Sequence, residues 1–109
     1  MTLKQAYVGK WRIDHMDEWD KDFIDLVAPG HFTIKKDGTG FFQFGVVEGE
    51  LDCRIEDSSG TERLAFSWQG FDEGDEVSGR GWAEVEGKKM KGWIHFHMGD
   101  DSGFTARKT

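Results

Sequence analysis

The stretch that decides the fold is VSGRGWAEVEGKKMKGWIHFHM, residues 77–98. With a two-residue turn at Gly87-Lys88, one face of the hairpin collects two opposite-charge pairs and an aromatic pair: Glu86–Lys89, Glu84–Lys91 and Trp82–Trp93. The other face becomes almost wholly apolar, with the pairs Val85–Met90, Gly81–Ile94, Gly79–Phe96 and Val77–Met98. A slip of one residue would destroy this sorting, because side chains alternate between the faces of a strand. The pattern therefore predicts an antiparallel hairpin in this register.

Three further hairpins continue the pattern towards the N-terminus. A turn at Glu48-Gly49 would place three apolar pairs inside: Val46–Leu51, Phe44–Cys53 and Phe42–Ile55. The tip SSGT (58–61) would oppose Glu56 to Arg63 and Cys53 to Phe66, and Gly79 and Gly81 would leave room for Phe66 and Trp68. The Asp37-Gly38 pair suits a three-residue loop with Gly38 in the left-handed region.

The whole chain reads as consecutive antiparallel strands. The expected strands cover residues 8–15, 31–36, 40–47, 50–57, 62–70, 76–86, 89–98 and 102–108. Fifteen glycines against one proline favour an all-β fold with many turns. Eight such strands close most naturally into an up-and-down barrel, which removes the exposed edges. An open, strongly curled sheet is the alternative.

One helix is expected between the first two strands. Asp17 would cap its N-terminus, and Pro29-Gly30 would stop it. Trp19, Phe23, Leu26 and Val27 share one apolar stripe, and the pairs Asp17–Lys21 and Lys21–Asp25 lie on its polar side. We expect this helix to lie across one end of the barrel, either as a lid over a cavity or as part of a solid core.

Composition limits the function classes. At 109 residues the chain is expected to form one domain, 1–109. Its net charge of −7 argues against nucleic acid and anionic membranes as partners. Cys53 is the only cysteine, and the N-terminal MTLKQAYVGKW lacks the apolar core of a signal peptide. No apolar run is long enough to cross a bilayer. A soluble, cytoplasmic protein is expected.

Two resemblances add to this reading. The segment Gly9-Lys10-Trp11 is similar to the Gly-x-Trp opening of lipocalins and their calycin relatives. In the fatty-acid-binding proteins of that superfamily, helices between the first two strands cover the mouth of the barrel. The segments WDKDFIDLV (19–27), FQFG (42–45), SGRGWAE (78–84) and DDSGFTARK (100–108) resemble a family of small bacterial proteins of unknown function. The resemblances imply a calycin-like barrel and transfer no activity.

The barrel interior is expected to be either filled or slightly hollow. The side chains expected to point inward are Trp11, Ile13, Phe32, Ile34, Phe42, Phe44, Val46, Leu51, Cys53, Ile55, Leu64, Phe66, Trp68, Val77, Val85, Met90, Ile94, Phe96, Met98 and Phe104. The many aromatic rings favour filling, whereas Gly79, Gly81, Ala83 and Gly92 could leave a slot. A small apolar ligand in that slot would contact Trp11, Trp19, Phe23, Phe44, Trp68 and Phe96.

The connections at the helix end are acidic. In an up-and-down barrel this end also receives VEGE (47–50), GFDEGDE (70–76) and GDDS (99–102), none of which holds a lysine or arginine. Such an end would attract a basic protein partner, although acidic residues also simply keep turns soluble. His15, His31 and His97 are expected nearby. A metal site is disfavoured because His95 would face Arg80 and no familiar ligand spacing occurs.

Catalytic signals are weak. Cys53 is expected to be buried and inert, and a Ser78–His97 pair lacks an evident carboxylate to orient it. The outer face shows the clearer anomaly. Phe41, Trp82 and Trp93 are expected to point outward, with Arg107 near Trp93, as in a self-association surface. The tryptophans could instead only stiffen their hairpin.

Taken together, these patterns leave enzymatic activity uncertain and favour a non-enzymatic binding module that forms a homodimer, with no metal and no cofactor. A carrier of a small apolar ligand is the first alternative. A metal protein or enzyme at the acidic, histidine-containing end is the second.

Overall fold

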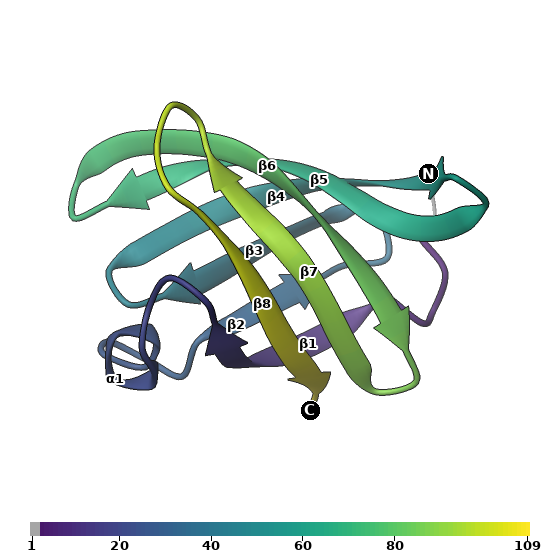
Figure 1. Cartoon of the computed structure of the whole chain (residues 1–109), viewed down its shortest axis with the longest axis horizontal. Helices are drawn as coiled ribbons and strands as arrows, with labels where there is room; N and C mark the ends of the chain where they lie inside the picture. Colours follow the sequence, from purple (N-terminus) through teal and green to yellow (C-terminus); the bar gives the residue numbers. More distant parts are fainter. Residues whose placement is uncertain (1–2) are drawn as a thin grey trace.

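The computed structural model describes residues 3–109 as a closed antiparallel barrel (Figure 1). Its elements are β1 (Gly9–Met16), α1 (Lys21–Ile24), β2 (His31–Ile34), β3 (Thr39–Phe44), β4 (Val47–Ser58), β5 (Thr61–Asp72), β6 (Asp75–Glu86), β7 (Lys89–Phe96) and β8 (Asp101–Lys108). Each strand pairs with the next, and β8 pairs with β1 to close the sheet. The predicted all-β, eight-stranded, up-and-down barrel is therefore confirmed, and it is compatible with a calycin-like barrel.

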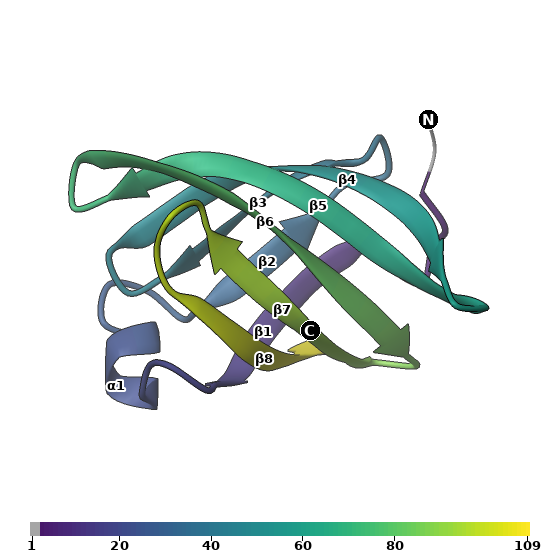
Figure 2. The same cartoon turned by 45° about the horizontal axis from the view of Figure 1, so that its top comes forward.

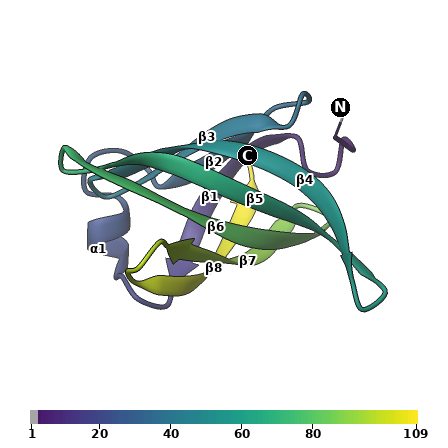
Figure 3. The ribbon, with the colours of Figure 1, turned by 90° about the horizontal axis from the view of Figure 1, so that it is seen from above.

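The two ends of the barrel are closed by different segments (Figures 2 and 3). At one end, here called the helix end, α1 lies beside the β3–β4 turn, and the β5–β6 turn is at the same end of the barrel. At the other, here called the far end, the N-terminal segment contacts Glu62 at the start of β5. Within residues 3–109, no helix has the length and apolar character needed to cross a lipid bilayer.

The β6–β7 register agrees with the prediction from Glu86–Lys89 through Gly79–Phe96. The predicted pair Val77–Met98 is wrong, because β7 ends at Phe96. There the backbone N–H of Phe96 donates to the Asp100 carbonyl at 2.9 Å, which starts the turn into β8. Met98 sits in that turn with φ 56, and its side chain is 95% exposed instead of buried.

The predicted turn of the β3–β4 hairpin is also wrong. The chain turns at Gly45-Val46, so Phe44 pairs with Val47 and Phe42 with Gly49. Gly45 takes the positive φ of 58 that this tight turn requires. Gly49 lies inside the barrel, where the rings of Phe42 and Trp68 cover its backbone. The β4–β5 tip and the three-residue loop at Gly38 follow the predicted registers.

The helix is shorter than expected. Asp20, not Asp17, is its N-cap and accepts from the Phe23 N–H at 2.9 Å. After Ile24 the helix ends, because the Asp25 carboxylate bonds Arg12 at 2.7 and 2.9 Å and accepts the Gly30 N–H at 2.9 Å. The buried apolar residue is therefore Ile24.

Two members of the predicted apolar stripe, Leu26 and Val27, are 63% and 61% exposed because they follow this early helix end. Of the predicted ion pairs, Lys21–Asp25 forms at 3.3 Å. Asp17 instead lies 3.0 Å from His15.

Most of the predicted interior is buried in one cluster. Ile55 is an exception at 36% exposed, because it lies where β4 extends past its last β3 partner, the Asp52–Thr39 pair. Val46 is half-buried in its turn. Val77, Val85 and Phe96 are half-buried and pack against the cluster.

The N-terminal segment closes the far end, which the sequence patterns did not predict. Leu3 and Tyr7 are buried, and the Leu3 N–H donates to the Lys36 carbonyl at 2.8 Å. The Tyr7 hydroxyl donates to Glu62 at 2.9 Å, and the Lys4 ammonium lies 2.6 Å from the same carboxylate. Burial and this bond raise the pKa of Tyr7 to about 12. The segment ties the start of the chain to the β4–β5 hairpin.

Candidate functional site

The six residues predicted to hold an internal ligand divide between the two ends of the barrel. Trp11 is fully buried and donates its indole N–H to the Tyr7 carbonyl at 3.0 Å, under the far-end segment. The other five share one aromatic cluster at the helix end: Trp19, Phe23, Phe44, Trp68 and Phe96. These six residues therefore do not line one common site.

Ring-to-ring packing occupies the helix end. The Trp19 ring centroid lies 5.0 Å from that of Phe44 and 5.9 Å from that of Phe96, and Trp68 meets Phe96 edge-on at 4.9 Å. These are the separations of aromatic rings in direct contact. The Gly45 N–H also donates to the Ile24 carbonyl at 2.9 Å, which fixes α1 against the β3–β4 turn. The helix therefore packs onto the core.

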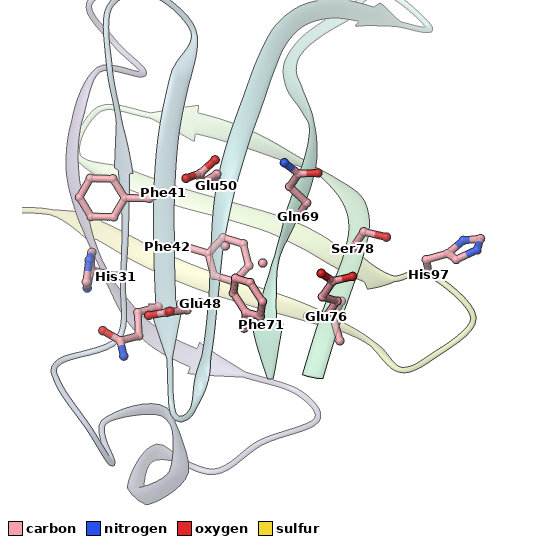
Figure 4. Close-up of a pocket in the computed structure, with 14 residues that line it drawn as sticks. His31, Phe41, Phe42, Glu48, Glu50, Gln69, Phe71, Glu76, Ser78 and His97 are labelled. Carbon is pink, nitrogen blue, oxygen red and sulfur yellow. The ribbon is translucent and has the colours of Figure 1, made fainter. Parts of the chain in front are cut away.

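The outside of the barrel carries a groove of about 940 Å³ across β3 to β6 (Figure 4). The floor of the groove consists of two rows of outward-pointing side chains, which the pairing of the strands aligns. The first row runs His31, Gln43, Glu48, Phe71, Glu76, and the second Phe41, Glu50, Gln69, Ser78. The register thus places Glu48 and Glu76 on either side of Phe71. We call this surface the acidic groove.

Two phenylalanine rings in the acidic groove face solvent. Phe41 is 42% exposed and Phe71 is 46% exposed. His31 meets the Phe41 ring edge-on at 5.8 Å, and the Lys35 ammonium lies 5.9 Å from the centroid of the same ring. An ammonium within about 6 Å of a ring centroid is attracted by the negative face of the ring. Lys35, which is not one of the residues that line the groove, shows that the Phe41 ring can accept an ammonium group.

The groove is negative. Glu48, Glu50 and Glu76 are all exposed. Among the described residues that line the groove there is no lysine or arginine. Within residues 3–109, no basic side chain forms an ion pair with these three carboxylates. The prediction that VEGE (47–50) forms a loop is wrong, because Glu48 and Glu50 are strand residues of β4. They point outward because Val47, Gly49 and Leu51 face the core.

The predicted self-association residues are on the outer surface but do not form one patch. Trp82 and Trp93 are paired in register and half-buried. The Arg63 guanidinium lies 4.7 Å from the Trp82 ring centroid, on the β5 side. The Trp93 indole donates to Asp101 at 3.1 Å, on the β8 side. Arg107 pairs with Asp14 of β1 and Phe41 lies in the acidic groove.

The histidines occupy separate positions. His15 lies 3.0 Å from Asp17, and His95 lies 3.4 Å from Asp101 while its strand partner is Arg80, as expected. His31 and His97 line opposite edges of the acidic groove, with His97 turned away from its centre (Figure 4). Within residues 3–109, no three His, Cys, Asp or Glu side chains converge as a metal site would require.

The two candidate nucleophiles differ in access. Ser78 lies in the acidic groove and receives the His97 backbone N–H on its carbonyl at 2.7 Å, so the two residues are neighbours through the backbone. Cys53 is buried, and burial raises the pKa of its thiol to about 12. A thiol in that state is a packing residue at neutral pH.

A second, smaller groove of about 490 Å³ adjoins the first on β4 to β7. Its charged lining residues are Asp52, Arg54, Glu56, Arg63, Arg80 and His95. Arg54 lies 3.6 Å from Asp52, and Arg63 lies 2.8 Å from Glu56. We call this surface the arginine groove.

Neither groove could be found from one strand alone, because each depends on the register of several hairpins.

Comparison of the chain with protein-family models, with curated proteins and with solved structures found no match.

Proposed function

We propose that this protein is a non-catalytic binding module whose acidic groove holds a cation carried on an apolar stem, as in the lysine side chains of a basic protein partner. One observation carries the proposal: Glu48 and Glu76 flank the exposed Phe71 ring, in a groove whose described lining contains no lysine or arginine. The carboxylates attract the charge, and the rings receive the methylene groups.

The close packing of the barrel interior favours a binding site on the outer surface. Trp19, Phe44 and Phe96 pack directly on one another at the helix end, and Leu3 and Tyr7 close the far end. A small apolar ligand inside the barrel would have to displace aromatic rings that already pack against one another. A ligand in the acidic groove needs no such rearrangement.

Titration with N-acetyl-lysine amide, followed by amide chemical shifts, tests the proposal. We expect shifts concentrated at Glu48, Phe71 and Glu76. N-acetyl-norleucine amide, which keeps a stem but lacks the charge, should bind more weakly. Glu76→Gln should weaken lysine binding about threefold, as expected for loss of one exposed charge interaction of about 0.7 kcal/mol.

Glu86→Gln is the matched control. Glu86 lies on the same strand, β6, and the change alters net charge equally, but Glu86 pairs with Lys89 at the other end of the strand. Equal loss of binding in Glu76→Gln and Glu86→Gln would show a general effect of net charge and would refute the site.

The homodimer remains a prediction, and we propose the Trp82/Trp93 face for it. Native mass spectrometry of the protein and of Trp82→Glu would test it, with a folded monomeric variant as the expected result. Kinship with calycins, carriage of an apolar ligand and a cytoplasmic location likewise remain predictions.

A further inference from the structure

The two grooves lie end to end on the same three strands. Along β6 the outward residues Glu76 and Ser78 belong to the acidic groove, and the next outward residue, Arg80, belongs to the arginine groove. On β5, Gln69 is followed in the same way by Ser67, and on β4 Glu50 is followed by Asp52. Within a few residues the outer face therefore changes from a lining with no arginine or lysine to one that holds three arginines together with Asp52 and Glu56.

Arg80 differs from the other two arginines of the groove in its ion pairing. The other two arginines of the groove already have carboxylate partners, Asp52 for Arg54 and Glu56 for Arg63. Among residues 3–109, no carboxylate lies within ion-pair distance of Arg80, which is exposed. Its neighbours in the row are Ser67 on β5 and His95 on β7. A short hydroxyl on one side leaves its guanidinium open to an anion.

From this arrangement we infer that the ligand is an extended peptide segment carrying a basic residue and, four positions along, an acidic one. This rests on the proposed function, since the basic residue would occupy the acidic groove between Glu48 and Glu76. Four residues separate Glu76 from Arg80 on β6, or about 13 Å at 3.3 Å per residue. An extended peptide lying along the strand covers the same length with four residues, and positions i and i+4 point to the same side.

Charge complementarity makes the segment specific. A second lysine at position i+4 would meet Arg80, which repels it, and an acidic residue at position i would meet three glutamates. The groove thus distinguishes the two ends of its ligand. Bidentate bonding of a carboxylate by a guanidinium adds directional preference at the arginine groove.

Three synthetic peptides test the spacing: acetylated and amidated Lys-Thr-Thr-Thr-Glu, Lys-Thr-Thr-Thr-Gln and Lys-Thr-Glu-Thr-Thr. Their dissociation constants are measured by chemical-shift titration at low salt. We expect the first to bind about threefold more tightly than the other two, the gain of one exposed charge pair. Arg80→Gln should remove that gain while leaving the affinity for Lys-Thr-Thr-Thr-Gln unchanged.

Arg54→Gln is the control variant, because it removes an arginine that already has a partner. It should leave the threefold preference intact, and loss of the preference there would overturn the assignment to Arg80. Equal binding of all three peptides at the acidic groove would overturn the i, i+4 inference and leave the proposed function standing. Failure of every lysine peptide to shift Phe71 and Glu76 would overturn both.

Discussion

Replacing Phe44 with alanine would test whether the helix end is filled or hollow. The Phe44 side chain is fully buried, and four aromatic rings surround it: Trp19 at 5.0 Å, Phe42 at 5.8 Å, and Phe23 and Phe96 at 6.4 Å. If these rings form a solid core, removing the central one leaves a cavity that its neighbours cannot fill without leaving their own contacts.

The expected loss of stability is large. A buried aromatic side chain withdraws about 150–250 Å² from water, and each Å² contributes about 25 cal/mol. The product is about 4–6 kcal/mol, part of which the alanine methyl retains. Core Phe→Ala substitutions cost about 3–5 kcal/mol, so we expect about 4 kcal/mol. That is a large part of the 5–15 kcal/mol typical of a domain.

Phe41→Ala is the matched control, because Phe41 lies on the same strand with its ring in the acidic groove. We expect it to cost less than about 1 kcal/mol. Urea unfolding followed by circular dichroism and tryptophan fluorescence measures both variants. At a slope near 2 kcal/mol per molar, the Phe44→Ala midpoint should fall by about 2 M. A fall no larger than that of Phe41→Ala would refute a filled helix end and make α1 a lid.

Three further outcomes are expected. Asp25→Asn should cost about 2 kcal/mol at pH 7, because Arg12 then loses a charge-assisted partner. The Arg12 and Gly30 bonds hold the pKa of Asp25 well below its usual 3.8, so this contribution is present above pH 4 and is lost as the pH falls further. If the stability of Asp25→Asn fell below pH 4 as steeply as that of the wild type, this expectation would be contradicted. Gly81→Ala should unfold more readily in urea, since an added methyl would collide with the Trp93 carbonyl and the Phe66 ring; wild-type stability would contradict it. Ellman's reagent at pH 8 should label Cys53 only after denaturation, and fast native labelling would show that the core opens.

How far the sequence could predict the fold depends on the turns. The β6–β7 hairpin was predictable because Glu84 and Lys91 face each other in only one register. The β3–β4 hairpin was not, because both candidate turns keep the same faces buried. Phe44 pairs with Val47 instead of Cys53, a shift of six residues, and an even shift leaves every side chain on its own face. Each candidate turn also contains a glycine, and in the structure it is Gly45 that takes the positive φ.

The helix and the grooves were harder to predict, because they depend on contacts between distant segments. At the end of α1 the Asp25 carboxylate accepts from Gly30 nearby and from Arg12 across the β1–α1 connection, and the second contact cannot be read from the local sequence. The acidic groove requires Glu48 and Glu76 to flank Phe71, which depends on the β4–β5 and β5–β6 registers together. The sequence indicated an acidic helix end, and Glu48, Glu50 and Glu76 of the acidic groove are three of the acidic residues behind that prediction.

Closure of the sheet through β1 and β8 has a consequence for synthesis of the protein. Of the eight strands of the barrel, β1 leaves the ribosome before the others, yet one of its two partners, β8, is made after the other seven. Until β8 is released, β1 and β7 each present a row of unpaired backbone groups, the kind of edge that invites pairing with another chain. Contacts so distant in sequence also slow the final folding step. Nascent chains stalled before Asp101 should therefore depend most on chaperones, and the risk should end once β8 is added.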